Sequence, residues 1–264
     1  MVQKTHCFLS CFDILGFKEL RKNRNTEGLY QLYQRHILPS MQHAAAGKSK
    51  TIRVDNKNLY VPDININSLS YRIFSDTIVI FTKDTSFMSF LNIVDSSQKI
   101  LQSGFMGSQS PFRGAIGFGD LIADQNGIIV GSALEDAYIG ETRQVWAGCM
   151  LTNICKEFIE EKDYFLQFKN LHEDLLTNNR NIKNHKNIEL KSKSIVEYNV
   201  PLYENPKDSL SDYYIENNYV IDWTINMYKG AALNSFLSHK DNKHAERIIN
   251  NTIDFENWAR KNNR

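Results

Sequence analysis

The sequence predicts an α+β fold in which helices pack over a largely antiparallel sheet. Two observations carry this prediction: strand-like and helical segments alternate irregularly along the chain, and two pairs of strand-like runs are joined by tight turns. A chain of 264 residues can bury a sizeable core. We expect one domain over residues 1–264, with the functional motifs in residues 1–162 and a C-terminal part, residues 163–264, that completes or extends it.

The chain begins with a predicted strand and two predicted helices. Residues 4–14 form an apolar, aromatic run that is typical of a buried strand. Gly16 then turns the chain, and apolar residues recur at helical spacing over residues 17–45, with a polar interruption at 23–26. Because a threonine at the start of a helix can accept a hydrogen bond from a backbone amide, Thr26 is expected to cap the second helix.

A hairpin is the next element. Residues 46–67 are polar and are expected to form a loop that contains at most a short strand at 51–54. The runs 68–74 and 77–82 are rich in β-branched and aromatic residues and are separated by only two residues. This pattern predicts a tight antiparallel hairpin.

A helix, a second strand pair and a long helix follow the hairpin. Residues 86–102 carry apolar side chains at the spacing of an amphipathic helix. The runs 112–123 and 127–131 are predicted strands, joined by a turn. Residues 133–162 are predicted to form one helix, from which Trp146 packs into the core or an interface.

The C-terminal part is predicted from weaker patterns. Residues 177–193 are rich in Asn and Lys and are expected to be a solvated segment rather than a binding patch. Strands are predicted at 194–200 and 219–225, and a final helix is predicted at 243–260.

The composition excludes several classes of protein. With 31 Lys and Arg against 30 Asp and Glu, the chain lacks the basic excess that is typical of a nucleic-acid-binding protein. It has no run of about 18 apolar residues, so no membrane span is expected. The four cysteines form no CxxC pair and no cluster with histidine, which argues against a zinc site or a disulfide framework. We expect a cytoplasmic protein.

Two carboxylates form the strongest constellation in the sequence. Asp13 lies near the end of the first predicted strand, and Asp76 lies in the turn of the first hairpin. Strand ends and turns often contain Asp for purely structural reasons. Two such residues on neighbouring strands, each next to a small residue, favour instead a site for a hard divalent cation and substrate phosphates.

Four segments, taken in order, resemble a known family. The sequences at 12–17 (FDILGF), 75–76 (SD) and 113–119 (RGAIGFG) resemble the three signatures of class III nucleotidyl cyclases. The segment 131–148, with its GSALEDAYIGE sequence, is similar to the cyclases of the bacterial Pycsar antiphage systems, which make cyclic UMP or cyclic CMP. The resemblance covers about residues 4–160. It implies a class III cyclase-like, ferredoxin-like sandwich.

The resemblance also implies roles for individual residues. Asp13 and Asp76 match the metal-binding aspartates, with the Ile14 carbonyl as a further ligand, for two Mg²⁺ or Mn²⁺ ions per site. Gly16 and Phe17 lie in the turn that binds phosphate in the family, and backbone amides at the start of a helix suit that task. The family further implies a homodimer with active sites at the interface, and a cyclic product that acts on a separate effector protein.

The position that reads the base points to a pyrimidine. Purine-specific relatives have Lys or Glu four residues before the second aspartate, where this chain has Arg72, next to Tyr71. An arginine donates hydrogen bonds to carbonyl oxygens such as those of uracil, and a tyrosine can stack or hydrogen-bond. The alternative is an arginine on an open sheet face that pairs with a nearby acid. The choice between UTP and CTP stays open.

One part of the family pattern is missing. Class III enzymes usually have Asn and, four residues later, Arg in the helix after the fifth strand, and that Arg stabilises the transition state. These positions are Glu135 and Ile139 in this chain. A replacement cation must come from elsewhere, and Arg113 and Arg143 are the candidates.

The sequence therefore predicts a pyrimidine nucleotide cyclase that converts UTP to 3′,5′-cyclic UMP and pyrophosphate in antiphage defence. A cytidylate cyclase is the first alternative. A non-catalytic nucleotide sensor with the same fold is the second, because the usual arginine is absent. Another two-metal nucleotidyl transferase would need a nucleic-acid track, which the near-zero net charge disfavours.

Overall fold

The computed structural model describes most of the chain. The described residues are 4–39, 49–54, 57–62, 69–108, 110–124, 127–167, 194–205, 212–225, 227–236 and 243–262. The solvated segment predicted at 177–193 lies outside them.

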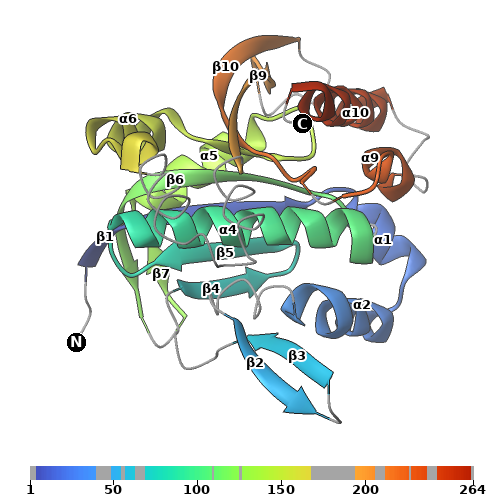
Figure 1. The fold of residues 1–264 in the computed structure, drawn as a ribbon. Coiled ribbons are helices and arrows are strands. Elements are labelled where there is room, and N and C mark those ends of the chain that lie inside the picture. The colour runs from blue at the N-terminus through green and yellow to red at the C-terminus, as the bar shows by residue number, and fades with distance from the viewer. Residues whose placement is uncertain are drawn as a thin grey trace.

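The centre of the molecule is one mixed sheet (Figure 1). Its strand order is β4-β5-β1-β6-β8-β10-β9, and β7 pairs with β6 beside this path. All pairs are antiparallel except β6 with β8. The strands are β1 (Lys4–Ile14), β4 (Leu69–Phe74), β5 (Thr77–Thr82), β6 (Phe112–Ala123), β7 (Ile129–Val130), β8 (Cys149–Leu151), β9 (Ile195–Tyr203) and β10 (Tyr213–Ile221). The predicted α+β class, with a largely antiparallel sheet, is confirmed.

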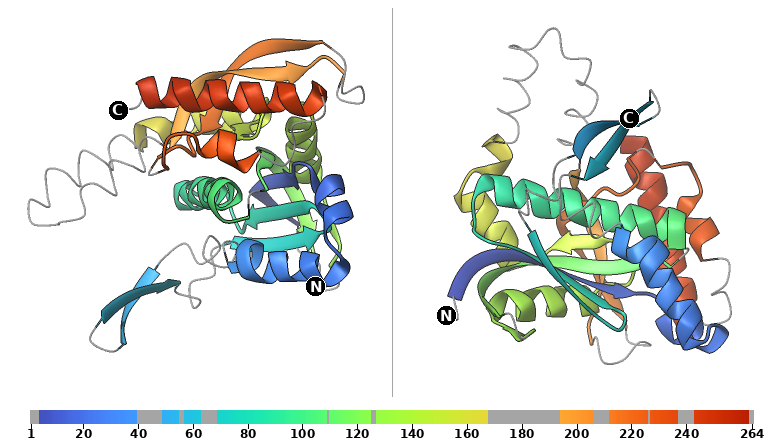
Figure 2. Two further views of the ribbon diagram at one scale, coloured as in Figure 1. Left: turned by 90° about the vertical axis from the view of Figure 1, so that its right-hand side faces the viewer. Right: turned by 90° about the horizontal axis from the view of Figure 1, so that it is seen from below.

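Helices lie on both faces of this sheet, as Figure 2 shows. The helical elements are α1 (Phe17–Asn23), α2 (Thr26–Leu32), the π-helix η1 (Tyr33–Ile37), α4 (Phe87–Ser103), the π-helix η2 (Gly104–Ser108), α5 (Ser132–Thr142), α6 (Asn153–Glu161), α9 (Ala231–Ser235) and α10 (Lys243–Asn262). The main core lies on the face covered by α4 and extends to α10, and a smaller core lies beneath α5.

The burial of β1 explains its central place. Phe8 and Phe12 join the main core, whereas Leu9 and Cys11 join the smaller core beneath α5. Because alternate residues of a strand point to opposite faces, a strand with apolar residues on both faces is covered on both sides. By the same alternation, Asp13 lies on the α5 side of the sheet, as Cys11 does.

The two predicted N-terminal helices are present, but the cap differs from the prediction. The side chain of Asn25 accepts a hydrogen bond from the Gly28 amide at 2.8 Å, so Asn25 is the N-cap and Thr26 is the first helical residue. Asparagine is at least as good an N-cap as threonine. The predicted break between the helices is correct.

The single helix predicted over residues 133–162 is wrong. The helix α5 ends at Thr142, and β8 then pairs with β6 before α6 begins. Trp146 lies in the connection, fully buried against Phe255 with ring centroids 4.7 Å apart, so it is a core residue but not a helical one. The Thr152 side chain caps α6, which marks a separate helix start.

The segment predicted as a loop at 46–67 contains a second sheet. Strands β2 (Ser49–Val54) and β3 (Lys57–Pro62) pair with each other, apart from the main sheet (Figure 1). The predicted short strand at 51–54 is part of β2, and β3 was not predicted.

Strands β9 and β10 join the same sheet as β1, so the C-terminal part continues the fold of the N-terminal part. The prediction of a strand at 219–225 is partly wrong, because β10 ends at Ile221 and the Asp222 side chain then accepts a hydrogen bond from the Thr224 amide in a turn. In the described part of the chain, no helix has the length and apolar character needed to cross a membrane.

Candidate functional site

The backbone brings the two predicted metal-binding aspartates together. Asp13 pairs with Thr77 across β1 and β5, one residue after Asp76. The Ile14 amide donates a hydrogen bond to the Asp76 carbonyl at 3.2 Å. The end of β1 is therefore fixed to the hairpin turn, and both carboxylates lie at the same edge of the sheet.

The hairpin turn is braced from η1. Ser75 has a φ of 54°, a left-handed conformation that is uncommon for a non-glycine residue. The Tyr33 hydroxyl donates a hydrogen bond to the Ser75 carbonyl. Burial, together with the charges of Asp76 and Asp13, raises the pKa of Tyr33 to about 12. Tyr33 thus stabilises the turn close to both carboxylates.

Both aspartates line one cavity of about 640 Å³, which we call the aspartate cavity. Predicted site residues gather around it: Asp13, Ile14, Gly16, Phe17, Asp76 and Arg113. The remaining walls come from the first turn of α1 and from the C-terminal region, through Leu15, Lys18, Glu19, Phe236, His244, Ala245 and Ile248.

Arg113 lies directly beside Asp13. The two residues are opposite each other in the register of β1 and β6, and Arg113 Nη2 is 3.9 Å from Asp13 Oδ2. The rest of the guanidinium is held by its own contacts: Nε lies 2.6 Å from Glu141 Oε1, and Nη1 donates to the Gln144 carbonyl at 3.1 Å. Nη2 is therefore the part of the guanidinium nearest to Asp13.

Gln144 connects this arginine to the core. Its side-chain amide donates to the Gly114 carbonyl at 2.6 Å and to the Gly140 carbonyl at 3.0 Å, and its side-chain oxygen accepts a hydrogen bond from Trp146 Nε1 at 2.9 Å. Gln144 is fully buried. Because every group of this side chain is used, the connection after α5 has a fixed conformation.

Negatively charged groups outnumber positively charged ones around Asp13. Burial and then the charge of Glu141 raise the pKa of Asp13 to about 7, although Arg113 opposes the shift. Burial likewise raises the pKa of Glu141, again against the effect of Arg113. The single guanidinium of Arg113 therefore contacts both Asp13 and Glu141. The remaining excess of negative charge favours the binding of a cation.

The donor set suits a divalent cation bound together with a substrate. Two carboxylates, from Asp13 and Asp76, and a backbone carbonyl at Ile14 are hard oxygen ligands, and Mg²⁺ usually binds to one or two carboxylates plus substrate phosphates. Among the described residues, no group of three or more His, Cys, Asp or Glu side chains forms a complete metal site. The two carboxylates and the carbonyl are of the chemical type that fits a metal whose other ligands are phosphate oxygens.

The two predicted base-reading residues point in opposite directions. Tyr71 packs against the main core on the α4 side, whereas Arg72 pairs with Val79, which lies in the smaller core on the α5 side. Arg72 Nη2 donates to the Asp124 carbonyl at 3.1 Å. Because these residues lie on opposite faces of the sheet, the structure does not bring Tyr71 and Arg72 together, and a contact of either side chain with a base stays a prediction.

Arg143 lies apart from the aspartate cavity. Its guanidinium donates a hydrogen bond to the Tyr214 hydroxyl on β10 and lies 5.7 Å from the centroid of that ring. Glu135 and Ile139, at the positions of the family's missing Asn and Arg, are exposed on α5. Of the two predicted replacement cations, only Arg113 lies beside Asp13 of the same chain.

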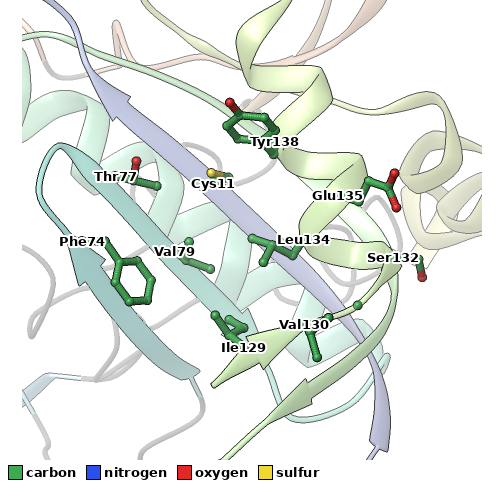
Figure 3. A pocket seen from close by; sticks show the side chains of 11 residues that line it. Cys11, Phe74, Thr77, Val79, Ile129, Val130, Ser132, Leu134, Glu135 and Tyr138 are labelled. Carbon is green, nitrogen blue, oxygen red and sulfur yellow. The ribbon is translucent and has the colours of Figure 1, made fainter. Parts of the chain in front are cut away.

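A second hollow, of about 670 Å³, lies between α5, β7 and the strands β1, β4 and β5 (Figure 3), and we call it the α5 groove. Its lining is mostly apolar: Cys11, Phe74, Thr77, Val79, Ile129, Val130, Gly131, Ser132, Leu134, Glu135 and Tyr138. Phe74, Val130 and Tyr138 are about half exposed, at 46%, 56% and 55%.

Three residues that line the aspartate cavity or contact its surroundings were not predicted from the sequence: His244, Glu141 and Tyr33. Glu141 lies in the segment 131–148, for which the sequence indicated only a family resemblance. A glutamate on the apolar side of a helix is nevertheless a signal for a buried ion pair. Tyr33 and His244 carry no local motif, and only the fold places them near Asp13.

No protein-family model and no curated protein matches the sequence. Similar solved structures include a monomeric guanylyl cyclase domain of the RhoGC fusion protein from the aquatic fungus Blastocladiella emersonii, at 12% identity and a TM-score of 0.46, over 61% of this chain and 88% of that chain. The guanylate cyclase domain of RhGC from Catenaria anguillulae, in complex with GTP, gives 12% identity and a TM-score of 0.44, over 60% and 84%. An adenylate/guanylate cyclase/hydrolase from Silicibacter pomeroyi gives 16% and 0.39, over 61% and 84%.

Proposed function

We propose that this protein is a nucleotide cyclase that converts a pyrimidine nucleoside triphosphate, UTP first and CTP as the alternative, to its 3′,5′-cyclic monophosphate and pyrophosphate. The observation that carries the proposal is the convergence of Asp13, Asp76 and Arg113 on one cavity. Two carboxylates and one guanidinium, at a buried strand end, are what a metal-bound triphosphate requires.

Asp13, Asp76 and the Ile14 carbonyl would hold two Mg²⁺ or Mn²⁺ ions. When bound, these ions neutralise the triphosphate and favour in-line displacement at the α-phosphorus. In the reaction the ribose 3′ oxygen forms a bond to the α-phosphorus, the bond from that phosphorus to the α,β-bridging oxygen breaks, pyrophosphate leaves, and the 3′-hydroxyl proton is released. The turn at Gly16 and Phe17 borders the cavity, and its backbone amides would bind phosphate oxygens there.

Arg113 supplies the positive charge that the missing family arginine would give. Its Nη2 is directed towards Asp13 by the contacts of Nε with Glu141 and of Nη1 with the Gln144 carbonyl. A fixed cation next to the α-phosphate stabilises the charge that develops in the transition state without reorganisation. Glu141 is then a positioning residue, because it acts through Arg113.

We place the base against the α5 side of the sheet. Arg72 lies on this face, as Asp13 does, and its guanidinium can donate to a pyrimidine carbonyl. We propose that a second copy of the chain covers the α5 groove, because this apolar hollow leaves Phe74, Val130 and Tyr138 half exposed. The product would activate a separate effector in antiphage defence, as in the Pycsar systems that the sequence resembles.

The test is product formation from each of the four ribonucleoside triphosphates in the presence of Mn²⁺. We expect a cyclic pyrimidine nucleotide and pyrophosphate, and loss of both in Asp76→Ala. Asp120→Ala is the matched control, because Asp120 forms an ion pair with Lys4 on the surface, at 2.6 Å. A cyclic purine as the main product would contradict the pyrimidine assignment.

The competing function is a nucleotide sensor that binds but does not react. The absence of the family's usual arginine at Ile139 is the observation that favours it. Binding of UTP with Mn²⁺ and no cyclic product from any nucleotide, at concentrations where the dimer forms, would support the sensor and overturn the cyclase.

A further inference from the structure

Few positive charges border the aspartate cavity. Among the described residues that line it, the lysines and arginines are Arg113 on β6 and Lys18 on α1. Arg113 is already engaged, because its Nε lies 2.6 Å from Glu141 Oε1 and its Nη1 donates to the Gln144 carbonyl at 3.1 Å. A triphosphate carries several negative charges, so Lys18 is the remaining lysine or arginine of this lining that is available to balance them.

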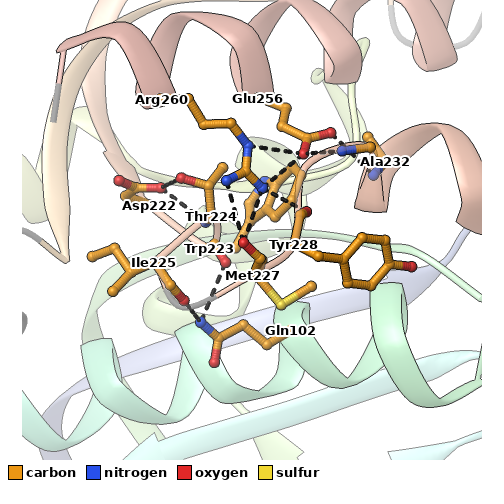
Figure 4. Close-up of polar contacts among 11 residues, drawn as sticks. Gln102, Asp222, Trp223, Thr224, Ile225, Met227, Tyr228, Ala232, Glu256 and Arg260 are labelled. Atoms are coloured by element: carbon orange, nitrogen blue, oxygen red, sulfur yellow. Dashed lines mark hydrogen bonds and ion pairs between the residues drawn. The ribbon is translucent and has the colours of Figure 1, made fainter. Parts of the chain in front are cut away.

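The C-terminal wall of the cavity adds no lysine or arginine to the described lining. It consists of His244 and three apolar residues. A buried polar network holds α10, which carries most of this wall, against the segment before α9 (Figure 4). Arg260 pairs with Glu256 at 2.8 Å and donates to the carbonyl oxygens of Met227 at 3.2 Å and Tyr228 at 2.6 Å. The arginine of this network is therefore engaged in holding the wall in place.

The backbone before Lys18 is attached to the strand ends that carry the site. The Ile14 amide donates a hydrogen bond to the Asp76 carbonyl at 3.2 Å, and the Leu15 amide donates to the Pro111 carbonyl at 2.9 Å. Lys18 follows in the first turn of α1. The base of its side chain is thus held close to the edge of the sheet where both aspartates lie.

The side chain of Lys18, in contrast to its backbone, is free. It is exposed, and no residue that the structure describes forms an ion pair or a hydrogen bond with its ammonium group. The neighbouring acid, Glu19, is paired instead with Lys22, whose Nζ lies 2.6 Å from Glu19 Oε1. Because a lysine carries three donors at the end of a flexible four-carbon chain, an unpaired lysine in the lining can move to meet a ligand.

We propose that Lys18 is a substrate-binding residue whose ammonium group pairs with the β- and γ-phosphates of a nucleoside triphosphate held by Asp13 and Asp76. This inference rests on the proposed function of the aspartate cavity. Arg113 lies beside Asp13, where the α-phosphate is proposed to react. Lys18 belongs to a different wall, just after the turn that is proposed to bind phosphate, so the two cations divide the phosphate chain between them.

The test measures the binding of inorganic tripolyphosphate with Mn²⁺ by calorimetry, which reports phosphate contacts without a base or a reaction. Lys18→Met removes the charge and should weaken binding about tenfold, since a hydrogen bond between charged groups is lost. Lys18→Arg should restore most of the affinity. Because Lys18 is exposed and unpaired, these substitutions should leave the fold intact.

Arg21→Met is the matched control. Arg21 lies one turn later on α1 and is exposed as well, but it does not line the cavity. The control therefore removes the same charge from the same helix, and it should leave the affinity for tripolyphosphate unchanged. The loss in Lys18→Met should also become smaller as the salt concentration is raised, because charge pairs at exposed sites are screened.

The outcomes separate this inference from the proposed function. Unchanged binding in Lys18→Met, or an equal loss in Arg21→Met, overturns the role of Lys18 alone if the wild-type protein forms cyclic nucleotide. Weakened binding in Lys18→Met only, with no cyclic product from the wild-type protein, supports the contact and overturns the cyclase. If the wild-type protein binds no tripolyphosphate with Mn²⁺, both proposals are wrong.

Discussion

The aspartate cavity and the α5 groove both border β1, yet they differ in chemistry. Buried charges define the first, where Asp13 and Glu141 share the guanidinium of Arg113. Half-exposed apolar side chains define the second, where Phe74 and Tyr138 face an open hollow. On β1, Cys11 lines the α5 groove, and Asp13, two residues later, lines the aspartate cavity. The comparison separates a cavity lined by charged side chains from a groove lined mostly by apolar ones.

The largest effect is expected from the cation in the aspartate cavity. Replacing Arg113 by Met should lower the rate of cyclic nucleotide formation by about 10²–10³-fold, because a fixed charge next to the α-phosphate is lost. Arg143→Met is the matched control, since Arg143 contacts Tyr214 instead. The measurement is the initial rate with Mn²⁺. A larger loss in the Arg143 variant would show that Arg143 is the catalytic cation.

A smaller effect is expected from Glu141, which acts only through Arg113. Glu141→Gln should lower the turnover rate about 10-fold with little change in KM, because the guanidinium loses its charged partner but stays in place. The double variant with Arg113→Met should be no slower than Arg113→Met alone, since residues that act as one unit are not additive. Additive losses in the double variant would mean that Glu141 acts independently.

The α5 groove is tested by self-association. Tyr138→Glu places a charge in the apolar hollow and should weaken dimer formation at least about tenfold, as measured by sedimentation. Ile154→Glu on α6 is the control, because Ile154 is similarly exposed at 52% but does not line the groove. An unchanged dimer in Tyr138→Glu would remove the groove from the interface.

The smallest effect is thermal. Saturating Mn²⁺ with tripolyphosphate should raise the melting temperature by about 3–5 °C, because a ligand that binds only the folded state stabilises it. The shift should disappear with a chelator and in Asp76→Ala, and it should persist in Tyr138→Glu. A shift of the same size in Asp76→Ala would place the metal elsewhere.

The places of Asp13 and Asp76 at strand ends could be predicted from the sequence, because local patterns define them. The apolar run before Asp13 and the two-residue turn at Asp76 indicate strand ends without reference to distant residues. The pairing of β1 with β5 then brings these ends together. The opposite directions of Tyr71 and Arg72 could also have been predicted, because consecutive residues of a strand point to opposite faces of the sheet.

Other parts of the site depend on contacts between distant segments. The strand β8 has three residues, too few to show a period, and its parallel pairing with β6 overrides the helical pattern around it. The burial of Glu141 depends on Arg113, and the place of His244 depends on the packing of α10. Neither the pairing of β8 nor the place of His244 has a local signature.

The central claim is that Asp13 and Asp76 bind divalent metal together with a triphosphate. The most direct measurement is anomalous scattering from Mn²⁺ in crystals of the full chain grown with 3′-deoxyuridine triphosphate, which lacks the attacking hydroxyl. We predict manganese peaks between the carboxylates of Asp13 and Asp76, with phosphate oxygens in the aspartate cavity beside Arg113. Manganese bound elsewhere, or a triphosphate outside this cavity, would contradict the claim.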